Sequence, residues 1–214
     1  MPSAHFTHLS NRCGTLIKKF AEPSIQAELD ALEKDQQIPD VDIDDVLALR
    51  LIAHAELEYY FEEIARAWIE SQRENMAFGQ TGEQSSLVFL YLQHRRLSPQ
   101  WSDINDANDE IVKVTNDEDF EKLLLAALDF AIETINNNEG IKSSSITLLA
   151  SLAGKFPGQI SETLVTELDR YGREYGEIAH STWKKVENVN IESATIEKRR
   201  VEEILQLIKS EFES

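Results

Sequence analysis

Apolar residues recur at spacings of three and four along most of this chain, and this periodicity limits its fold more than any other feature. Such spacings place side chains on one face of an α-helix, whereas a half-buried strand alternates at every second residue. One continuous series comprises Ile160, Leu164, Leu168, Tyr171, Tyr175 and Ile178. Eight glycines and five prolines among 214 residues leave few interruptions. The sequence therefore predicts an all-α fold, a bundle of five or more helices with short connections.

Turn residues and candidate caps set the boundaries of the expected helices. These helices cover residues 10–34 with a bend near Pro23, 42–75, 86–95, 116–135, 143–156, 160–183 and 193–212. Asp42 or Asp44 is the expected cap of the long second helix, and Asn116 or Asp117 is that of the fourth. The long helix carries the apolar series Val46, Ala53, Leu57, Tyr60, Ile64 and Trp68. We expect one helical domain over residues 1–214, with residues 1–40 as an N-terminal helical extension of the bundle formed by residues 41–214.

The chain is strongly acidic, with 39 acidic and 21 basic side chains and a net charge of −18. Such a surface repels polyanions at long range, which counts against a broad nucleic-acid-binding face. A local site remains compatible with this charge, because a few cations dominate their surroundings within one Debye length.

Cysteine content and hydropathy restrict the compartment in which the chain works. Cys13 is the single cysteine, so an intrachain disulfide is excluded and a cysteine-based metal site is not expected. The longest apolar runs, such as residues 123–128, are too short to span a bilayer. The N-terminus lacks a charged start followed by an apolar stretch, so we expect no secretory signal and a cytoplasmic location.

One helical face in the segment 160–183 carries the residues best suited to chemistry. At about 100° per residue, Arg173 and His180 lie opposite the apolar series and point the same way, roughly 10 Å apart along the axis. Gly176 lies between them and leaves a notch on that face. A glycine inside a helix costs about 1 kcal/mol relative to alanine. Gly172 and Gly176 therefore indicate either close packing against another helix or the approach of a ligand such as a phosphate backbone.

An arginine and a histidine on one face suit phosphoryl chemistry. The guanidinium of Arg173 is a planar cation that matches phosphate oxygens in bidentate fashion. The imidazole of His180 titrates near neutrality and can take or give a proton. Together they can cleave RNA without a metal: the histidine assists attack by the 2′-hydroxyl or protonates the leaving oxygen, and the arginine stabilises charge on the phosphorus oxygens.

At these residues the sequence resembles the HEPN superfamily, whose active members carry an arginine, four to six residues and then a histidine. Here the motif reads Arg173-Glu-Tyr-Gly-Glu-Ile-Ala-His180, with six intervening residues and the Ile-Ala-His ending typical of the family. The long helix with "LRLIAHAELEYYFEEIA" also resembles an early helix of the superfamily, in particular of its RiboL-PSP-HEPN branch. The likeness covers roughly residues 43–70 and 117–212. It departs from the family at Glu174, where members often carry a small polar residue.

The resemblance implies a HEPN-like bundle and a metal-independent endoribonuclease with Arg173 and His180 as catalytic residues. It also implies a homodimer in which two motifs form one composite cleft, a role in toxin–antitoxin or antiviral defence systems, and an antitoxin-like protein partner. The alternative is a catalytically silent protein of the same fold that binds a protein partner or a nucleotide through the same face. Neither alternative requires a cofactor or a metal.

Other polar residues have structural explanations that we weigh against functional ones. His54 lies one turn from Arg50 beside the apolar series, and a structural role is expected; the alternative is that His54, Glu56 or Glu58 joins the cleft of the motif. The remaining clusters are the helix-ending His94, Arg95 and Arg96, the basic pair Lys184 and Lys185, and the acidic loop with Asp103, Asp106, Asp109 and Glu110. The acidic loop lacks the ordered ligands and glycine of an EF-hand, so a solvated loop is expected.

Overall fold

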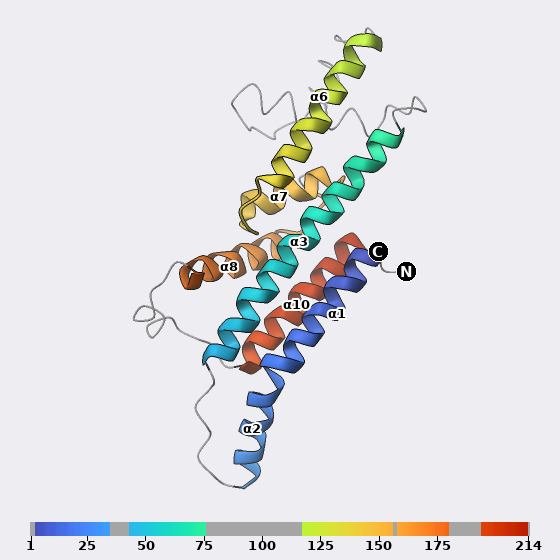
Figure 1. Ribbon diagram of the computed structural model, residues 1–214. Helices are drawn as coiled ribbons and strands as arrows, with labels where there is room; N and C mark the ends of the chain where they lie inside the picture. The colour runs from blue at the N-terminus through green and yellow to red at the C-terminus, as the bar shows by residue number, and fades with distance from the viewer. Residues whose placement is uncertain (1–2, 35–42, 76–116, 156–157, 180–193, 214) are drawn as a thin grey trace. The chain divides into compact units, whose positions relative to one another are not determined.

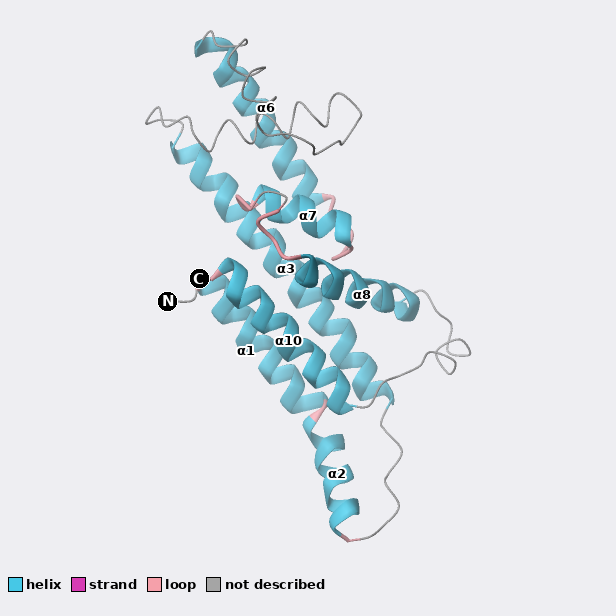
Figure 2. Cartoon of the chain, turned by 180° about the vertical axis from the view of Figure 1, so that it is seen from behind, coloured by secondary structure: helices cyan, strands magenta, loops and turns pink. Residues whose placement is uncertain are grey.

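The computed structural model describes residues 3–34, 43–75, 117–155, 158–179 and 194–213, and every regular element in them is a helix (Figures 1 and 2). The helices are α1 (Ala4–Phe20), α2 (Glu22–Glu33), α3 (Ile43–Asn75), α6 (Asp117–Asn136), α7 (Ser143–Leu152), α8 (Glu162–Ala179) and α10 (Ala194–Phe212). The described residues contain no strand, which confirms the predicted all-α class. The helix expected over residues 86–95 lies outside the described residues.

The chain divides into two compact units. The first unit comprises residues 1–60, 140–146 and 160–214, and the second comprises residues 61–139 and 147–159. Helix α3 passes through both units, so its two halves are treated separately below. The single domain with an extension over residues 1–40 stays a prediction.

Helix α1 begins six residues before the expected start because Ser3 caps it. The Ser3 hydroxyl accepts a hydrogen bond from the Phe6 N–H at 3.1 Å, which satisfies a donor that the first turn leaves unpaired. Ala21 separates α1 from α2, and Pro23 occupies the first turn of α2, where its missing N–H costs little. The predicted bend near Pro23 is confirmed.

The core of the first unit is built from α1, α8, α10 and the first half of α3. Its fully buried side chains include Leu9, Cys13, Leu49, Ala53, Leu57, Leu164, Leu168, Tyr171, Val201 and Ile208. The series predicted for the segment 160–183 is therefore buried at Leu164, Leu168 and Tyr171 and half-buried at Ile160. The side chains of Tyr175 and Ile178 lie outside the described residues. This burial fixes which face of α8 turns away from the core.

In the second half of α3 the predicted apolar series is wrong. Ile64 and Trp68 are only half-buried, and the core positions are instead Phe61, Ala65 and Ile69. The two sets differ by one residue, which is about 100° around the helix. Because this half of α3 belongs to the second unit, it buries a different face, and one series drawn along the whole helix could not describe both.

Within the second unit, α7 ends at a turn in which Gly154 lies close to Trp68. Gly154 adopts φ +80°, and a Cβ there would lie 2.6 Å from the indole Nε1 of Trp68. The Gly154 N–H donates to the Ser151 carbonyl at 3.1 Å, and the Lys155 N–H donates to the Ala150 carbonyl at 2.8 Å. This is a Schellman cap, which needs a left-handed residue and here also the space that only glycine leaves.

No described helix combines the length and the apolar character that crossing a bilayer requires.

Candidate functional site

Arg173 projects from α8 on the side away from the buried residues Leu164, Leu168 and Tyr171. Its side chain is 71 % exposed, so the prediction of an accessible helix face is confirmed for this residue. His180 follows the last residue of α8 and lies outside the described residues, as do the surroundings of Gly176. The juxtaposition of the guanidinium and the imidazole therefore stays a prediction.

Asp169, one turn before Arg173, holds the guanidinium in an ion pair with its Oδ2 atom. The other carboxylate oxygen, Oδ1, accepts the N–H of Ser143 at 2.8 Å, at the first residue of α7. The hydrogen bond from Ser143, followed by the contact with Arg173, holds the pKa of Asp169 below its usual value. The carboxylate is thus ionised at neutral pH and fixed from two sides, which restrains the position of Arg173.

Gly172 explains how α8 approaches the chain just before α7. A Cβ at Gly172 would lie 3.2 Å from the carbonyl oxygen of Ile141, tighter than most Cβ contacts. For Gly172 the packing interpretation is therefore sufficient, because the absent side chain lets α8 lie against this backbone.

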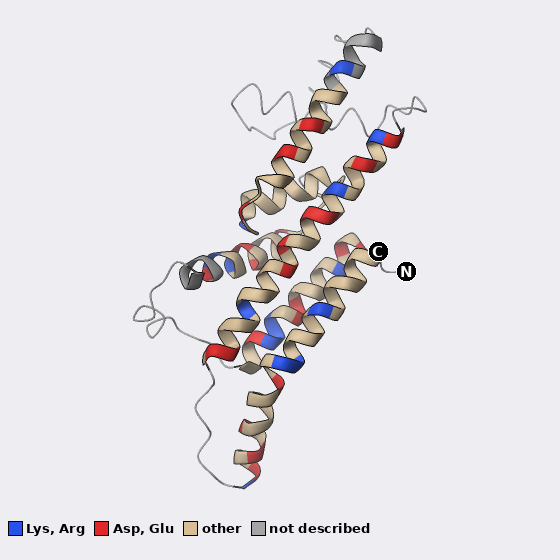
Figure 3. Ribbon diagram, viewed as in Figure 1, with Lys and Arg blue, Asp and Glu red and all other residues tan. Residues whose placement is uncertain are grey.

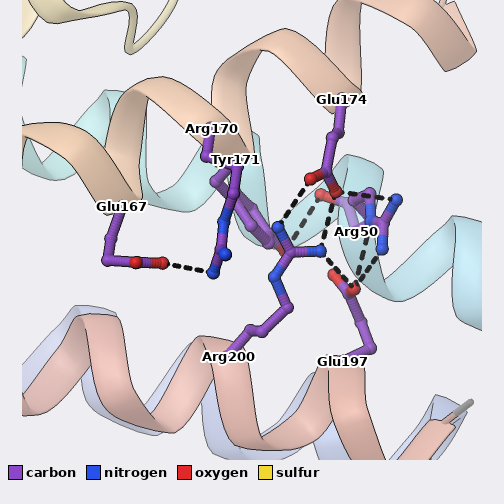
Figure 4. Close-up of polar contacts among 7 residues, drawn as sticks. All are labelled: Arg50, Glu167, Arg170, Tyr171, Glu174, Glu197 and Arg200. Carbon is purple, nitrogen blue, oxygen red and sulfur yellow. Dashed lines mark hydrogen bonds and ion pairs between the residues drawn. The ribbon is translucent and has the colours of Figure 1, made fainter. Parts of the chain in front are cut away.

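The residue after Arg173, Glu174, faces inward and joins three other charged side chains; we call these four residues the buried ion-pair cluster. Figure 4 shows its members, Arg50 from α3, Glu174 from α8, and Glu197 and Arg200 from α10. Arg200 binds both oxygens of Glu174 at 2.7 and 2.8 Å. Arg50 donates to Glu197 at 2.5 Å and lies 3.2 Å from Glu174. Two guanidinium groups and two carboxylates make the cluster neutral, so it adds no net charge to the core.

Tyr171 covers one side of this cluster. Its ring centroid lies 5.7 Å from the guanidinium carbon of Arg200, and its hydroxyl donates to the Arg50 carbonyl at 3.5 Å. Burial, and then the negative charge of Glu197, raises the pKa of Tyr171 well above its ordinary value. Burial also opposes ionisation of Glu174, but Arg200 and Arg50 outweigh it and lower the Glu174 pKa. The tyrosine is therefore neutral and Glu174 is charged at pH 7.

The cluster gives Glu174 a structural role. Its carboxylate bridges Arg50 and Arg200. Sequence reasoning treated Arg50 as one member of an isolated pair with His54 and missed Glu197 and Arg200 entirely. A signal was present, because both lie on the apolar face of α10 together with Val201 and Ile204. Charged residues on an apolar face need partners.

His54 is a buried core residue. It is 2 % exposed, and burial lowers its pKa to about 4, so the ring is neutral at pH 7. Gly140 lies against it, since a Cβ there would sit 3.7 Å from the ring Cε1 atom. Glu56 is directed to α1, where it accepts a hydrogen bond from Arg12 at 2.8 Å. These contacts support the structural role expected for His54.

A second candidate place is a groove of about 570 Å³ in the second unit, between α3 and α6. It is lined in part by Arg66, Arg73, Asp129 and Asn136. Arg66 donates to Asn136 at 3.2 Å, and Arg73 lies 3.5 Å from Asp129, so both cations are engaged by the wall of the groove itself. The groove is also lined by Glu70 and Glu133, so its carboxylates outnumber its two arginines and its charge does not favour an anion such as a phosphate.

The other predicted clusters cannot be compared with the structure. His94 to Arg96, Lys184, Lys185 and the acidic loop with Asp103, Asp106, Asp109 and Glu110 lie outside the described residues. Among the residues that the structure describes, no three histidine, cysteine or carboxylate side chains come close enough together to hold a metal ion.

No family model matches this chain, and neither a curated protein nor a solved structure does so. The residues and contacts above are therefore the basis for a functional proposal.

Proposed function

We propose that this protein is a metal-independent endoribonuclease of the HEPN type, with Arg173 and His180 as its catalytic residues. The observation that carries the proposal is the accessible guanidinium of Arg173 on a helix whose opposite face is fixed in the core. The histidine follows seven residues later in the sequence, at the spacing that the family motif requires. Arg50 and Arg200, by contrast, are neutralised inside the buried ion-pair cluster.

In the proposed reaction, His180 acts as general base on the 2′-hydroxyl of the nucleotide before the cut, or as general acid on the leaving oxygen. The 2′-oxygen attacks phosphorus, the bond to the 5′-oxygen breaks, and that oxygen takes up a proton. The products are a 2′,3′-cyclic phosphate and a 5′-hydroxyl end. Arg173 stabilises the negative charge that builds on the non-bridging oxygens. A guanidinium has five N–H donors, so contact with Asp169 at one nitrogen leaves others for the phosphate.

We further propose that two copies associate so that both motifs line one cleft, and that the protein serves as a toxin or a defence nuclease controlled by an antitoxin-like partner. These proposals rest on the resemblance of the motif to the HEPN superfamily. They explain how a strongly acidic chain could act on RNA, because a dimer would bring the Arg173 guanidinium groups of both chains to one place.

The decisive experiment incubates pure protein with mixed RNAs in excess chelator and analyses the ends of the products. Cleavage in chelator with 2′,3′-cyclic phosphate and 5′-hydroxyl ends supports the proposal. Cleavage that requires a divalent metal, or 3′-hydroxyl products, would contradict it, because the 2′-hydroxyl would then not be the nucleophile.

A second candidate function is that of a catalytically silent binding protein of the same fold. The ion pair between Arg173 and Asp169 favours it, because a carboxylate already compensates the cation that a phosphate would need. The net charge of −18 favours it as well. In that case the same face engages a protein partner or a nucleotide, and RNA stays intact under all ionic conditions.

A further inference from the structure

Helix α2 has little tertiary support within the first unit. It contains 12 residues, and Ala31 is its one buried residue. Figures 1 and 2 both show it continuing beyond the end of α1. Its first turn is held by an ion pair, since the ammonium of Lys198 in α10 lies 3.9 Å from Glu22. An isolated helix of about this length is marginal in water, and among the described residues only Ala31 of α2 is buried in the core.

The same helix carries an exposed apolar stripe formed by Ile25, Leu29 and Leu32, which we call the leucine stripe. The spacings of four and three place the three side chains on one face. Leu29 is 50 % exposed and Leu32 is 61 % exposed, while Ile25 is half-buried. A single exposed leucine is ordinary, but an aligned series on an otherwise weakly supported helix has the spacing of a helix–helix seam.

Carboxylates flank the leucine stripe on both sides. At about 100° per residue, Glu28 lies roughly 65° to one side of the centre of the stripe, and Glu22 and Glu33 lie roughly 55–75° to the other. Acidic residues are coloured red on α2 in Figure 3, and the helix contains no lysine or arginine. Flanking charges of this kind select the partner helix in coiled-coil pairs, because they meet the charges that flank the opposing seam.

We propose that the leucine stripe of α2 is the docking site for an amphipathic helix of another protein, one whose apolar seam is flanked by lysine or arginine. Basic flanks would pair with Glu28 and Glu33, and the apolar seam would cover Leu29 and Leu32. A second copy of α2 is disfavoured as the occupant, because in either orientation it would place carboxylates against carboxylates. The leucine stripe lies on α2 and Arg173 lies on α8, so the test below does not require RNA cleavage.

The test uses two designed helical peptides with the same leucine seam, one flanked by lysine and one by glutamate. Binding to the full chain is measured by fluorescence anisotropy at physiological salt. We expect the lysine-flanked peptide to bind and the glutamate-flanked peptide to bind at least 10-fold more weakly. Charge reversal through Glu28→Lys and Glu33→Lys is expected to invert this preference.

A pair of leucine variants separates docking from general attraction to an acidic protein. Leu29→Glu with Leu32→Glu adds negative charge but removes the seam, and binding of the lysine-flanked peptide is expected to fall at least 10-fold. Leu125→Glu is the matched control, because Leu125 in α6 is 45 % exposed, and it is expected to leave binding unchanged. The proposal would be overturned if the double variant bound the lysine-flanked peptide as tightly as the wild type does. It would also be overturned if that variant converted a dimer into a monomer in sedimentation, which would assign the stripe to self-association.

Discussion

Two arginines on α8 share the same type of local partner but differ in how that partner is held. Arg170 pairs with Glu167 at 2.5 Å, and that pair lies within α8. Arg173 pairs with Asp169, whose second oxygen is bound by the N–H of Ser143 in α7. The carboxylate that holds Arg173 is thus anchored by a second helix, which favours Arg173 as a residue that positions a phosphate.

The first prediction concerns the separate roles of His180 and Arg173 in the proposed cleavage reaction. His180→Ala is expected to slow RNA cleavage by about 10²–10⁴-fold, because it removes a general acid–base group. Arg173→Lys is expected to restore little of the activity lost in Arg173→Ala, because an ammonium lacks the planar fork of the guanidinium. Both are measured as rates at saturating RNA. Full activity in His180→Ala would show that another group transfers the proton.

The second prediction concerns His54 and acid stability. The imidazole pKa is lowered by burial from 6.5 to about 4, so the unfolded chain binds a proton at a higher pH than the folded chain. The contribution of neutral His54 to the free energy of unfolding is therefore complete above pH 6.5. It is lost as the pH falls toward 4, in total about 3 kcal/mol. In urea unfolding, His54→Gln is expected to be less stable at pH 7 and to lose less stability than the wild type between pH 7 and pH 4.

His8→Gln is the control for this experiment, because His8 is exposed on α1. It is expected to be as stable as the wild type at pH 7, because it replaces no buried side chain. If the free energy of unfolding changed with pH in the same way for the wild type and His54→Gln, His54 would protonate as readily in the folded protein as in the unfolded chain.

At the scale of elements, α10 connects the helices of the first unit through polar contacts at both of its ends. Near its start, Glu197 and Arg200 form the buried ion-pair cluster with α3 and α8. Near its end, Glu213 binds the hydroxyl of Ser3 at 2.7 Å, and Glu211 binds the backbone N–H of Ser161 at 3.0 Å. Ser3 caps α1, and the Ser161 hydroxyl accepts the Leu164 N–H in the first turn of α8. Glu211 of α10 and Glu213, which follows its last residue, thus lie at two helix N-termini, where negative charge is favourable.

The third prediction concerns the buried ion-pair cluster. Glu197→Ala leaves Arg50 buried with one carboxylate fewer, and we expect a loss of about 3–5 kcal/mol in the free energy of unfolding. Arg199→Ala on the same helix breaks a pair with Glu203 whose members are both exposed, and little change is expected. Urea unfolding measures both.

A double variant distinguishes an uncompensated charge from a simple loss of packing. Arg50→Met with Glu197→Met replaces both charges by apolar groups and is expected to be more stable than Glu197→Ala. If Glu197→Ala and Arg199→Ala were equally mild, the cluster would contribute no more than a surface ion pair.

The helices were predictable because helix formation depends on local spacing. Leu164, Leu168 and Tyr171 are buried as their spacing indicates. The buried face of the second half of α3 was not predictable, because it depends on which unit covers that half. The cluster was not predictable either, because Arg50 and Glu197 are separated by 147 positions and meet only in the folded chain. For the candidate site, the sequence correctly placed Arg173 on an exposed face but gave no indication of the contact of Asp169 with Ser143.

At the scale of the whole molecule, the net charge of −18 sets a condition on any activity toward RNA. Long-range repulsion slows the approach of a polyanion, and salt screens it. Moderate salt is therefore expected to accelerate cleavage at low RNA concentration until it also weakens the local contact with Arg173. Initial rates measured across a salt series test this, and a rate that falls steadily from the lowest salt would contradict it.

The central claim is that Arg173 acts in catalysis, and one comparison tests it most directly. RNA cleavage in chelator is measured for the wild type, Arg173→Ala and Arg170→Ala. The two variants each remove one exposed arginine from the same helix and each break one ion pair with a nearby carboxylate. We predict a loss of about 10²–10³-fold for Arg173→Ala and near-normal rates for Arg170→Ala. Equal rates in the two variants, or no cleavage by the wild type, would contradict the claim.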